Sequence, residues 1–574
     1  MPVHNIEIAQ TLNKLADLLE IEGANVFRVR AYRNAARLVE SLPRSVADMV
    51  AANEDLAELP GIGEALALKM KEIVETGHLQ ALEKEAKHVP ETLSDLMKIP
   101  GLGPKRVHEI FEKLKIADLK GLGNAVRTGK LRALAGFAEK TEHKIREYIE
   151  RKSKAGNRVL WFTAEQIVAP LLKTLQGVKG IKQVVPAGSF RRRLETVGDV
   201  DILATGADSA EIMRRFVEYE DAVKVLAHGQ TRSAIVLRSG LQVDLRVVPE
   251  ESYGATLHYF TGSKTHNIAI RARALQAGLK LNEYGVFRGE KRIGGATEQE
   301  IYAAVQLPYI EPELRESRGE IEAAERGQLP KLVGLADIRG DLHAHSRATD
   351  GQSTIAELAA TAQKRGYEYL AITDHSKHLS MVHGLNTTRL RQQIREIDRL
   401  NEKFHGFRIL KSTEVDILES GELDLSDDIL RELDLVVGAV HHIFTLSRAK
   451  QTERIIRAMD NPYFNILAHP SGRLIGEREA YEVDLERLLA AARERGCFLE
   501  LNSHPQRLDL NDAYCRMAKE LGVKVAIATD AHRPADLELM RFGIGQARRG
   551  WLEKEDVLNA SSWRSLQQLL KRSR

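Results

Sequence analysis

Histidine and carboxylate side chains recur at the ends of short apolar runs in residues 338–574. Seven runs end in this way, and the residues that follow them are His343, His345 and Asp350; Asp374 and His375; Glu414; His441; His469; Asn502 and His504; Asp530 and His532. Imidazole and carboxylate groups without thiolates suit Zn²⁺, Mn²⁺ or Fe²⁺ clusters that hydrolyse phosphate esters. A single histidine in an apolar setting is usually a core residue, but seven runs with the same ending indicate a shared metal site.

Helical patterns such as TIAELAATAQKRG and LERLLAAARERG separate several of these runs. Strands that alternate with helices predict a parallel sheet. Because candidate ligands stand at the C-terminal end of every strand, we expect a barrel with one catalytic mouth.

A second acidic motif lies in residues 188–203, where Gly188-Ser189 precedes three arginines and then Asp199 and Asp201. Residues two apart on a strand point to the same face, so the two aspartates project together while their neighbours pack inward. Asp244 has the equivalent place on a later predicted strand. Three carboxylates on adjacent strands can hold two Mg²⁺ ions, a set suited to attack by a 3′ hydroxyl and release of pyrophosphate. A lone Asp-x-Asp is more often a solvated strand edge, but the preceding Gly-Ser and arginines favour a triphosphate site.

Two segments of the first 155 residues repeat one pattern, in which Pro-Gly-x-Gly stands between helix-like stretches. The glycines are Gly61 and Gly63 in the first copy and Gly101 and Gly103 in the second. Such glycines permit a tight turn whose backbone N–H groups can bind a phosphate at the start of the next helix. These segments resemble helix-hairpin-helix motifs, which hold the DNA backbone without reading sequence. A third, weaker copy is expected at residues 134–138.

The composition is that of an ordinary globular protein, and the 574 residues are too many for one hydrophobic core. Residues 1–310 contain 45 Lys and Arg against 39 Asp and Glu, an excess that suits phosphate contacts but also fits an ordinary solvated surface. No apolar run is long enough to span a membrane. Two cysteines, Cys497 and Cys515, are too few for a disulfide framework, so we expect a cytoplasmic protein.

Residues 156–312 resemble the palm and thumb of family X DNA polymerases, on the motifs GSFRRRLETVGDVD, LQVDLRVV and YFTGSKTHN. The resemblance implies that Asp199, Asp201 and Asp244 are the catalytic, metal-binding aspartates. It also implies contacts to the incoming nucleotide, from Gly188, Ser189, Arg192 and Gly198 at the triphosphate, Tyr259, Phe260 and Gly262 at the sugar, Asn267 at the base and Arg271 on the template side.

The segment NVFRVRAYR (25–33) resembles the small N-terminal domain of the same polymerases, which binds the 5′ side of a DNA gap. In relatives a lysine of the hairpin helix forms a Schiff base at an abasic site. Lys69 has that place here, whereas the lysine that some relatives carry one turn earlier is Ala65. Lys69 could therefore serve a lyase reaction or simply touch phosphate. The DNA-binding set expected from the hairpins is Gly61, Gly63, Lys69, Gly101, Gly103, Lys105 and Arg106.

Residues 338–574 resemble the PHP (polymerase and histidinol phosphatase) family, on the motifs HAH, TDH, AHP and TDAH. The resemblance implies up to three metal ions, held by His343, His345, Asp350, His375, Glu414, His441, His469, Asp530 and His532. His442, His383 and His504 are further candidates, and the adjacent pair 441–442 leaves one ligand open. Arg473 is a candidate for steadying a substrate phosphate.

These resemblances together imply a multidomain protein of mixed α+β and α/β class, similar to bacterial family X polymerases fused to a PHP domain. The expected parts are helix-hairpin-helix regions at 1–88 and 89–155, a nucleotidyltransferase palm at 156–250, an α+β thumb at 251–312, a linker at 313–337 and a distorted (β/α)7 PHP barrel at 338–574. The implied activity is gap filling in DNA repair, with 3′→5′ exonuclease activity in the PHP domain and, in some relatives, processing of abasic sites or 3′ phosphates.

The expected cofactors are Mg²⁺ or Mn²⁺ at the palm and up to three Mn²⁺, Zn²⁺ or Fe²⁺ ions at the barrel. The expected partners are gapped or primer–template DNA and dNTPs, bound by a monomer. Three other hypotheses stay open at this stage: a nuclease with an inactive palm, a DNA-binding scaffold with silent sites, and a small-molecule phosphatase. The last of these leaves the hairpins and the triphosphate motif unexplained.

Overall fold

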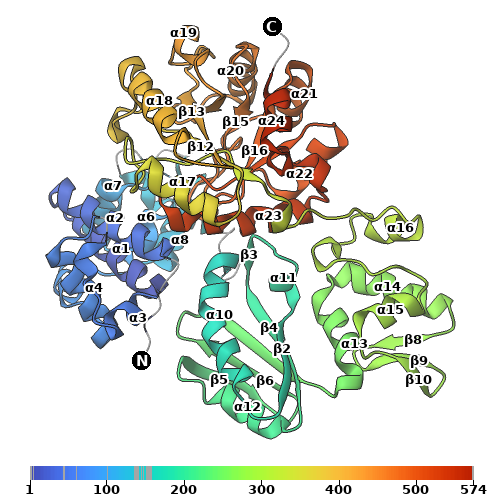
Figure 1. The fold of residues 1–574 in the computed structure, drawn as a ribbon. Coiled ribbons are helices and arrows are strands. Elements are labelled where there is room, and N and C mark those ends of the chain that lie inside the picture. The colour runs from blue at the N-terminus through green and yellow to red at the C-terminus, as the bar shows by residue number, and fades with distance from the viewer. Residues whose placement is uncertain are drawn as a thin grey trace.

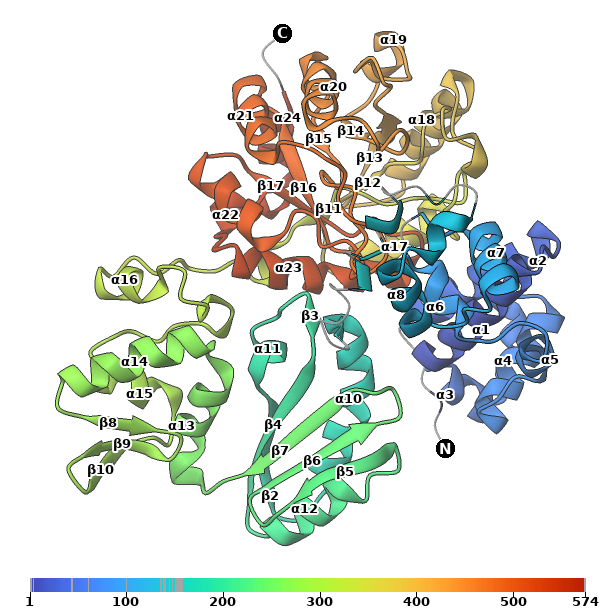
Figure 2. The ribbon, with the colours of Figure 1, turned by 180° about the vertical axis from the view of Figure 1, so that it is seen from behind.

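The computed structural model describes residues 3, 5–42, 45–59, 61–99, 101–134, 137, 141–143, 145, 146, 148, 149 and 158–571. Its parts form four regions, which follow the chain from a helical region through two mixed units to a large barrel (Figure 1). The view from behind shows the helical region beside the barrel and the two mixed units below it (Figure 2). None of the helices in the described residues has the length and apolarity needed to cross a membrane.

The N-terminal region is all helical and encloses a core of its own. Its elements are α1 (Asn5–Ile21), α2 (Val26–Ser41), α3 (Val46–Ala51), η1 (Leu56–Glu58), α4 (Glu64–Thr76), α5 (Gln80–Ala86), α6 (Leu93–Met97), α7 (Pro104–Leu114), α8 (Leu119–Arg127) and η2 (Lys130–Ala133). In both glycine repeats the first glycine is left-handed, with φ of +75° at Gly61 and +90° at Gly101. The second glycine is the N-cap of the next helix, α4 or α7. The expected tight turns are therefore present; the third repeat (134–138) lies mostly outside the described residues.

The second region is a five-stranded sheet with the order β2-β4-β7-β6-β5. Its elements are β1 (Val159–Leu160), α10 (Trp161–Gln176), β2 (Ile181–Pro186), α11 (Gly188–Arg191), β3 (Thr196–Val197), β4 (Asp199–Gly206), α12 (Ser209–Val217), β5 (Ala222–His228), β6 (Arg232–Leu237) and β7 (Gln242–Val247). Two of the interior strands, β4 and β7, are parallel neighbours, and α10 and α12 pack on apolar residues of the sheet. This arrangement fixes the acidic strands in the interior of the sheet.

The third region combines helices with a small antiparallel sheet, β10-β9-β8. Its elements are α13 (Glu250–Thr261), α14 (Lys264–Gln276), β8 (Lys280–Asn282), β9 (Gly285–Arg288), β10 (Lys291–Gly294), α15 (Glu298–Ala304), η3 (Pro312–Leu314) and α16 (Glu320–Glu325). The segment 313–337, expected as a linker, is folded in its first half: Arg315 is fully buried and pairs with Glu298, and Glu320 accepts from His266 at 2.6 Å. Charged side chains of this segment therefore form buried pairs with the rest of the third region.

The C-terminal region is a sheet of seven parallel strands in chain order, each next to the one before. The strands are β11 (Gly340–Asp341), β12 (Tyr369–Ile372), β13 (Arg408–Asp416), β14 (Leu435–Ala439), β15 (Ile466–Leu467), β16 (Phe498–Asn502) and β17 (Val525–Ala528). The sheet curves toward closure, because Asp341 at the end of β11 accepts hydrogen bonds from the N–H (3.1 Å) and hydroxyl (2.5 Å) of Thr529, which follows β17. The predicted barrel of seven strands is confirmed.

Helices cover the outside of the barrel and explain the amphipathic patterns between its strands. They are η4 (Leu335–Asp337), α17 (Ile355–Lys364), η5 (Ser380–Val382), α18 (Thr387–Asn401), α19 (Asp427–Leu430), α20 (Arg448–Asp460), α21 (Leu485–Arg495), α22 (Asp512–Glu520), η6 (Pro534–Leu539), α23 (Met540–Arg549), η7 (Lys554–Asp556), η8 (Leu558–Ala560) and α24 (Trp563–Leu570). The strands are buried on both faces, as expected for a parallel sheet inside a layer of helices.

Candidate active sites

The palm carboxylates meet because β4 and β7 are parallel neighbours with Asp201 opposite Asp244. Asp199 and Asp201 point to the same side of β4, while Val200 and Ile202 between and beyond them are each 1% exposed. The alternation predicted from the sequence therefore holds on both strands. On each strand, the apolar side chains that alternate with the aspartates pack in the core and so fix the position of the carboxylates.

Three carboxylates so close together repel one another. Burial and, to a smaller extent, the charges of Asp199 and Asp244 raise the pKa of Asp201 to about 7. Asp244 is partly compensated, because it accepts hydrogen bonds from Arg232 (3.0 Å) and Gln242 (2.7 Å). These carboxylates have little positive charge close to them, so they are suited to bind divalent cations, which prefer hard oxygen ligands.

The loop before β4 approaches the carboxylates at Gly188. This residue has φ of +62°, and a Cβ built on it would lie 2.6 Å from Oδ2 of Asp201. Only glycine permits both the conformation and the approach. Ser189 lies next to it at the start of α11, and Gly198 lies against Arg158 just before β4.

The arginines of this loop are already engaged. Arg192 donates to Glu316 (2.9 Å) and to the carbonyl of Thr261 (2.8 Å), and Arg191 pairs with Glu298 at 2.7 Å. The predicted contact of Arg192 with a triphosphate would require these bonds to be exchanged, so it stays a prediction.

The remaining nucleotide residues gather at the junction of α13 and α14. Asn267 donates to the carbonyls of Tyr259 (2.6 Å) and Gly262 (3.2 Å), and a Cβ at Gly262 would lie 2.4 Å from its Oδ1. Arg271 lies over the ring of Tyr259 at 5.0 Å, and Arg246 covers the ring of Phe260 at 4.4 Å. The expected sugar and base residues therefore form one contiguous group.

The hairpin residues are arranged differently in the two repeats. Gly61, Gly63, Gly101, Gly103 and Lys105 are exposed. Lys69 is half-buried and donates to the carbonyl of Ala65 at 3.2 Å, one turn back on α4. Arg106 donates to the carbonyl of Gly101 at 2.7 Å and stabilises the second turn.

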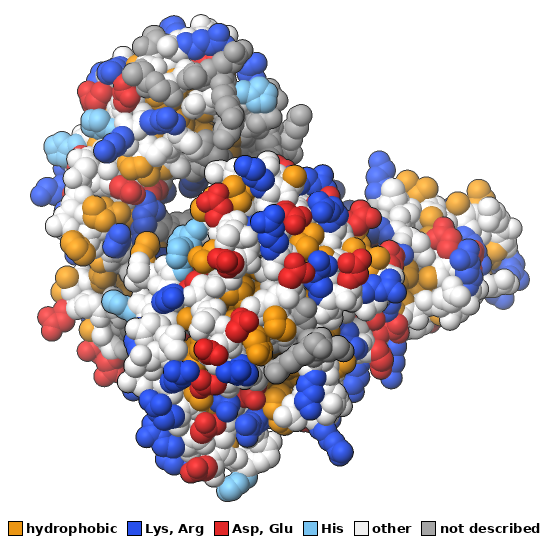
Figure 3. All heavy atoms as spheres, turned by 90° about the horizontal axis from the view of Figure 1, so that it is seen from above, with side chains coloured by type: hydrophobic (Ala, Val, Ile, Leu, Met, Phe, Trp, Pro, Cys, Tyr) orange, Lys and Arg blue, Asp and Glu red, His pale blue; other side chains and the backbone are white. Residues whose placement is uncertain are grey.

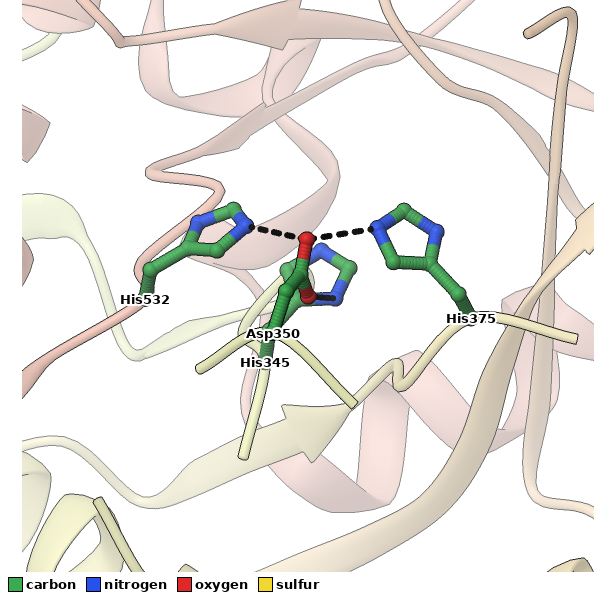
Figure 4. A group of neighbouring side chains, drawn as sticks. All are labelled: His345, Asp350, His375 and His532. Atoms are coloured by element: carbon green, nitrogen blue, oxygen red, sulfur yellow. Dashed lines mark ion pairs between the residues drawn. The ribbon is translucent and has the colours of Figure 1, made fainter. Parts of the chain in front are cut away.

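The nine predicted ligands of the barrel converge at its C-terminal mouth. Ligand atoms of four of them, His345, Asp350, His375 and His532, lie within 4.8 Å of one another (Figure 4). Two further groups share members with it: one adds His343 and Asp530, and the other adds Glu414 and His441. His469 joins through Nε2, which lies 2.9 Å from Glu414. Three overlapping groups fit the expected number of metal ions.

Asp350 is the bridge of the first group, since its Oδ2 lies 3.3 Å from Nε2 of both His375 and His532. Glu414 is the bridge of the third, with oxygens 2.8 Å from Nδ1 of His375 and 3.3 Å from Nε2 of His441. Carboxylates shared between imidazoles are the arrangement that multinuclear metal sites use.

Several imidazole nitrogens in this cluster are buried and make no hydrogen bond of suitable geometry within the described residues, although carboxylate oxygens lie close to some of them: Nε2 of His343, both nitrogens of His345, and Nδ1 of His375. Buried polar atoms are normally satisfied, so an unsatisfied set needs a ligand. The donor types and their convergence fit metal cations. Burial lowers the pKa of His343, but the carboxylates of Glu500, Asp530 and Glu414 outweigh burial and hold that pKa well above its usual value.

Two carboxylates that the sequence interpretation missed orient these ligands. Glu500, inside β16, lies 2.7 Å from Nδ1 of His343 and accepts the backbone N–H of His469 at 2.6 Å. Asp416, at the end of β13, lies 2.8 Å from Nδ1 of His441. Carboxylates behind metal-bound imidazoles fix the ring tautomer. The signal available in the sequence was an acidic residue within a predicted strand.

The less certain histidines lie at the edge of the cluster. His441 converges with Glu414, whereas His442 is 43% exposed with its Nε2 3.8 Å from Asp416. His383 is exposed after η5, and His504 lines the neighbouring cleft. Arg473 donates to Glu195 and to carbonyls of its own region instead of facing the cluster. Arg507, which the sequence interpretation did not single out, lies 3.6 Å from Asp530.

These folds and clusters define a phosphoryl-transfer enzyme with two separate sites, one of three aspartates on a mixed sheet and one of histidines and acids at the mouth of a barrel. Family comparisons agree with this class. Family profiles match residues 3–79 (helix-hairpin-helix domain), 93–151 (SAM-like helix-hairpin-helix tandem), 256–316 (DNA polymerase beta thumb) and 341–504 (PHP domain).

Whole-chain comparison extends the match to the full length. The chain is 39% identical over 576 residues to the DNA polymerase/3′-5′ exonuclease PolX of Bacillus subtilis (strain 168), covering 100% of both chains. It is 33% identical to a probable phosphatase of Thermoanaerobacter sp. (strain X514) over 38% of this chain and 89% of that one. It is 26% identical to DNA polymerase lambda of Rattus norvegicus over 54% of this chain and 56% of that one. The chain therefore belongs to the bacterial PolX family of family X DNA polymerases with a C-terminal PHP domain.

Proposed function

We propose that this protein fills short gaps in DNA with its palm and trims 3′ ends with its PHP barrel. The observation that carries the proposal is the presence, in one chain, of two complete and separate clusters: Asp199, Asp201 and Asp244 on β4 and β7, and nine ligand residues at the barrel mouth. The named activities of the full-length Bacillus relative support it.

At the palm, the three aspartates would hold Mg²⁺ or Mn²⁺. Cations held there would supply positive charge for activation of a 3′ hydroxyl and for stabilisation of the departing pyrophosphate. The chain supplies the positions: the apolar halves of β4 and β7 fix the carboxylates, and Gly188 admits the triphosphate loop beside Asp201. Ser189, Arg192 and Gly198 would contact the triphosphate, and Tyr259, Phe260, Gly262, Asn267 and Arg271 would hold the sugar, base and template.

At the barrel, the nine ligands would hold up to three Mn²⁺, Zn²⁺ or Fe²⁺ ions, with Mn²⁺ preferred for trimming. The chain again supplies orientation, because Glu500 and Asp416 hold the rings of His343 and His441 from behind. The mouth is buried enough to exclude bulk water from most ligand atoms: His343 and His345 are 1% and 0% exposed.

The expected substrates are gapped or primer–template DNA and dNTPs. The hairpin residues Gly61, Gly63, Gly101, Gly103, Lys105 and Arg106 would hold phosphates, and Lys69 would touch phosphate or serve a lyase reaction. The boundaries proposed for the domains are 1–88, 89–155, 156–250, 251–312, 313–337 and 338–574, and the protein is proposed to act as a monomer.

The test uses a labelled one-nucleotide-gapped duplex with Mn²⁺, with and without dNTPs. We expect the wild type to extend the primer with dNTPs and shorten it without them. The Asp199→Ala/Asp201→Ala variant should lose extension alone, and the His343→Ala/His345→Ala variant should lose shortening alone. His405→Ala, on an exposed barrel turn, is the matched histidine control. Shortening that survives in the double histidine variant would contradict the nuclease assignment, and absence of extension in the wild type would contradict the polymerase assignment.

A further inference from the structure

A cleft of about 750 Å³ adjoins the metal-ligand cluster of the barrel. Its lining comes from three regions of the chain: the N-terminal region, with α2 and Gly61 of the first glycine turn; the residues around the start of α10; and loops of the barrel mouth that include Asp350, Asp530 and His532. The cluster therefore opens into a space that another domain closes on the far side. In the space-filling view from above, a hollow separates two lobes and histidine side chains lie at its edge (Figure 3).

The wall formed by α2 is polar and cationic. Arg30, Asn34 and Arg37 all line the cleft, and their spacing of four and three residues puts them on one face of the helix. All three are exposed, and Arg37 donates to Oδ1 of Asn34 at 2.5 Å. The opposite face of α2 is buried in the helical core, where Ala35 and Ala36 are both 0% exposed. The core thus holds this cationic face toward the barrel.

Two other residues of the lining add apolar surface. Phe162, at the start of α10, is half-buried and packs edge-on against Phe542 with ring centroids 5.3 Å apart. Met381, in η5 of the barrel, is 86% exposed at the cleft. Cationic groups that follow a backbone, together with apolar or aromatic surfaces on which bases can stack, are the combination that binds single-stranded nucleic acid.

The charge balance of the cleft also favours a nucleic-acid strand over a single phosphate ester as its ligand. Asp350, Asp530 and Asp536 line the barrel side, and Arg533 on the same side is paired with Asp536 at 2.7 Å. A polyanion that leaves the cluster must therefore be compensated by cations elsewhere. Arg30 and Arg37 are placed across the cleft to do so. A lone phosphate ester held at the cluster would not require cations on a different domain.

We propose that α2 is the second wall of the nuclease cleft, and that Arg30 and Arg37 bind phosphates of a single-stranded 3′ segment whose terminal nucleotide lies at the barrel cluster. This inference rests on the nuclease function proposed above. It gives α2 a role in trimming in addition to the contact with the 5′ side of a gap implied by its resemblance.

The test compares Arg30→Ala/Arg37→Ala with Lys14→Ala/Lys98→Ala in the full-length chain. The control removes the same charge from the same region, at lysines that pair with Glu91 and Asp95 and do not line the cleft. The first measurement is anisotropy of a fluorescent single-stranded oligonucleotide in EDTA. The arginine variant should bind about tenfold more weakly, and its log K against log[salt] slope should fall by about 1.4, since each single-strand phosphate contact contributes about 0.7. Arg30→Lys/Arg37→Lys should restore most of the salt slope.

The second measurement follows 3′ trimming of the same strand and hydrolysis of the p-nitrophenyl ester of thymidine 5′-monophosphate, both with Mn²⁺. The arginine variant should lose about tenfold in kcat/KM for the strand, in line with its weaker binding, and keep the ester rate within about twofold. Binding and trimming equal to those of the lysine control would overturn the proposal. So would a parallel loss of ester hydrolysis, because the arginines would then act through the metal cluster. A wild type that cleaves neither substrate would refute the nuclease function itself, and the binding data in EDTA would still decide the role of α2.

Discussion

Arg473 of the barrel and Glu195 of the palm form an ion pair, with Nη2 and Oε1 2.5 Å apart. Glu195 follows the arginines of the triphosphate loop, and it also accepts from Gln546 of α23 at 2.7 Å. A second pair joins the same units, Arg541 with Glu165 at 2.5 Å. Arg549 of the barrel pairs at 2.9 Å with Glu316, which lies in the third region and also accepts from Arg192 of the palm. The barrel therefore holds the loop that we propose binds the nucleotide.

Breaking this pair should loosen the palm from the barrel. We expect Arg473→Ala and Glu195→Gln each to lower the thermal midpoint of the full chain, and a double-mutant cycle to give a coupling energy of about 1 kcal/mol or more, because both side chains are mostly buried. Differential scanning fluorimetry measures the midpoints. Additive single effects would show that the pair contributes no coupling. Arg495→Ala, whose partner Asp460 lies within the barrel, is the control.

Adding a methyl group at Gly188 should disable the palm alone. The Cβ of Gly188→Ala would lie 2.6 Å from Asp201, so the loop must move and dNTP incorporation should fall by about 100-fold or more. The matched control is Gly240→Ala, which has φ of +83° but no atom within 4 Å of the added Cβ. That variant should lose only about 1 kcal/mol of stability and keep incorporation. Equal losses in both variants would assign the effect to backbone strain. Primer-extension kinetics and 3′ trimming are read on the same samples.

Removing the carboxylate behind His343 should weaken the barrel cluster without touching the palm. Glu500→Gln keeps the shape of the side chain but removes the charge that orients His343 and the backbone N–H of His469. We expect bound Mn²⁺ or Zn²⁺ to be held about 10- to 100-fold more weakly, with a matching loss of trimming. Metal content after dialysis and extension of a gapped primer are the two measurements. Unchanged metal affinity would contradict the orienting role.

Metal removal and pH should act together on Asp201. Its pKa is raised by burial and by Asp199 and Asp244 to about 7, so the folded state prefers the protonated form. In EDTA its contribution to stability is complete below about pH 4 and is lost as pH rises through about 7. The thermal midpoint in EDTA should therefore fall between pH 5.5 and 8.5 by more in the wild type than in Asp201→Asn. Mg²⁺ should restore the midpoint at pH 8.5 in the wild type, and a similar rise in Asp201→Asn would argue against the palm as its site.

Acid should weaken the third region at Glu298. Burial alone would raise the pKa of this side chain, but Arg315 and Arg191 lower it to about 2. The stability it contributes is present above the unfolded value near 4.5 and is lost as pH falls toward 2. The difference corresponds to roughly 3 kcal/mol for a side chain that is 6% exposed. Glu298→Gln should destabilise the protein at pH 7 and flatten its stability between pH 5 and 3, as measured by urea unfolding. An unchanged acid limb would show that other carboxylates dominate it.

Local sequence patterns were sufficient to predict the strands and the residues that stand at their ends. The alternation around Asp199 and Asp201 predicted which side chains face out, and the structure has the apolar partners at 1% exposure. The endings of seven apolar runs predicted a barrel with one mouth, because parallel strands place their C-terminal ends on one edge. These features depend on the period of a strand, which short stretches of sequence carry.

Interactions between residues that are far apart in the chain could not be predicted from local sequence patterns. The roles of Glu500 and Asp416 depend on which imidazole each one faces, over separations of 157 and 25 residues. Arg473 could be assigned to a substrate phosphate from its position after His469, yet its guanidinium pairs with Glu195, 278 residues away. The charged segment expected as a linker contains the fully buried Arg315, whose partner Glu298 compensates its desolvation.

The sequence by itself determined the fold class, the two candidate clusters and the family resemblance, since these rest on residue types at fixed local spacing. Only the tertiary structure decided that His441 and not His442 joins the cluster, that the barrel holds the triphosphate loop, and that α2 faces the nuclease mouth. The physical reason is that a side chain's direction and partner depend on how separate elements pack, and packing is set by contacts that no short stretch of sequence contains.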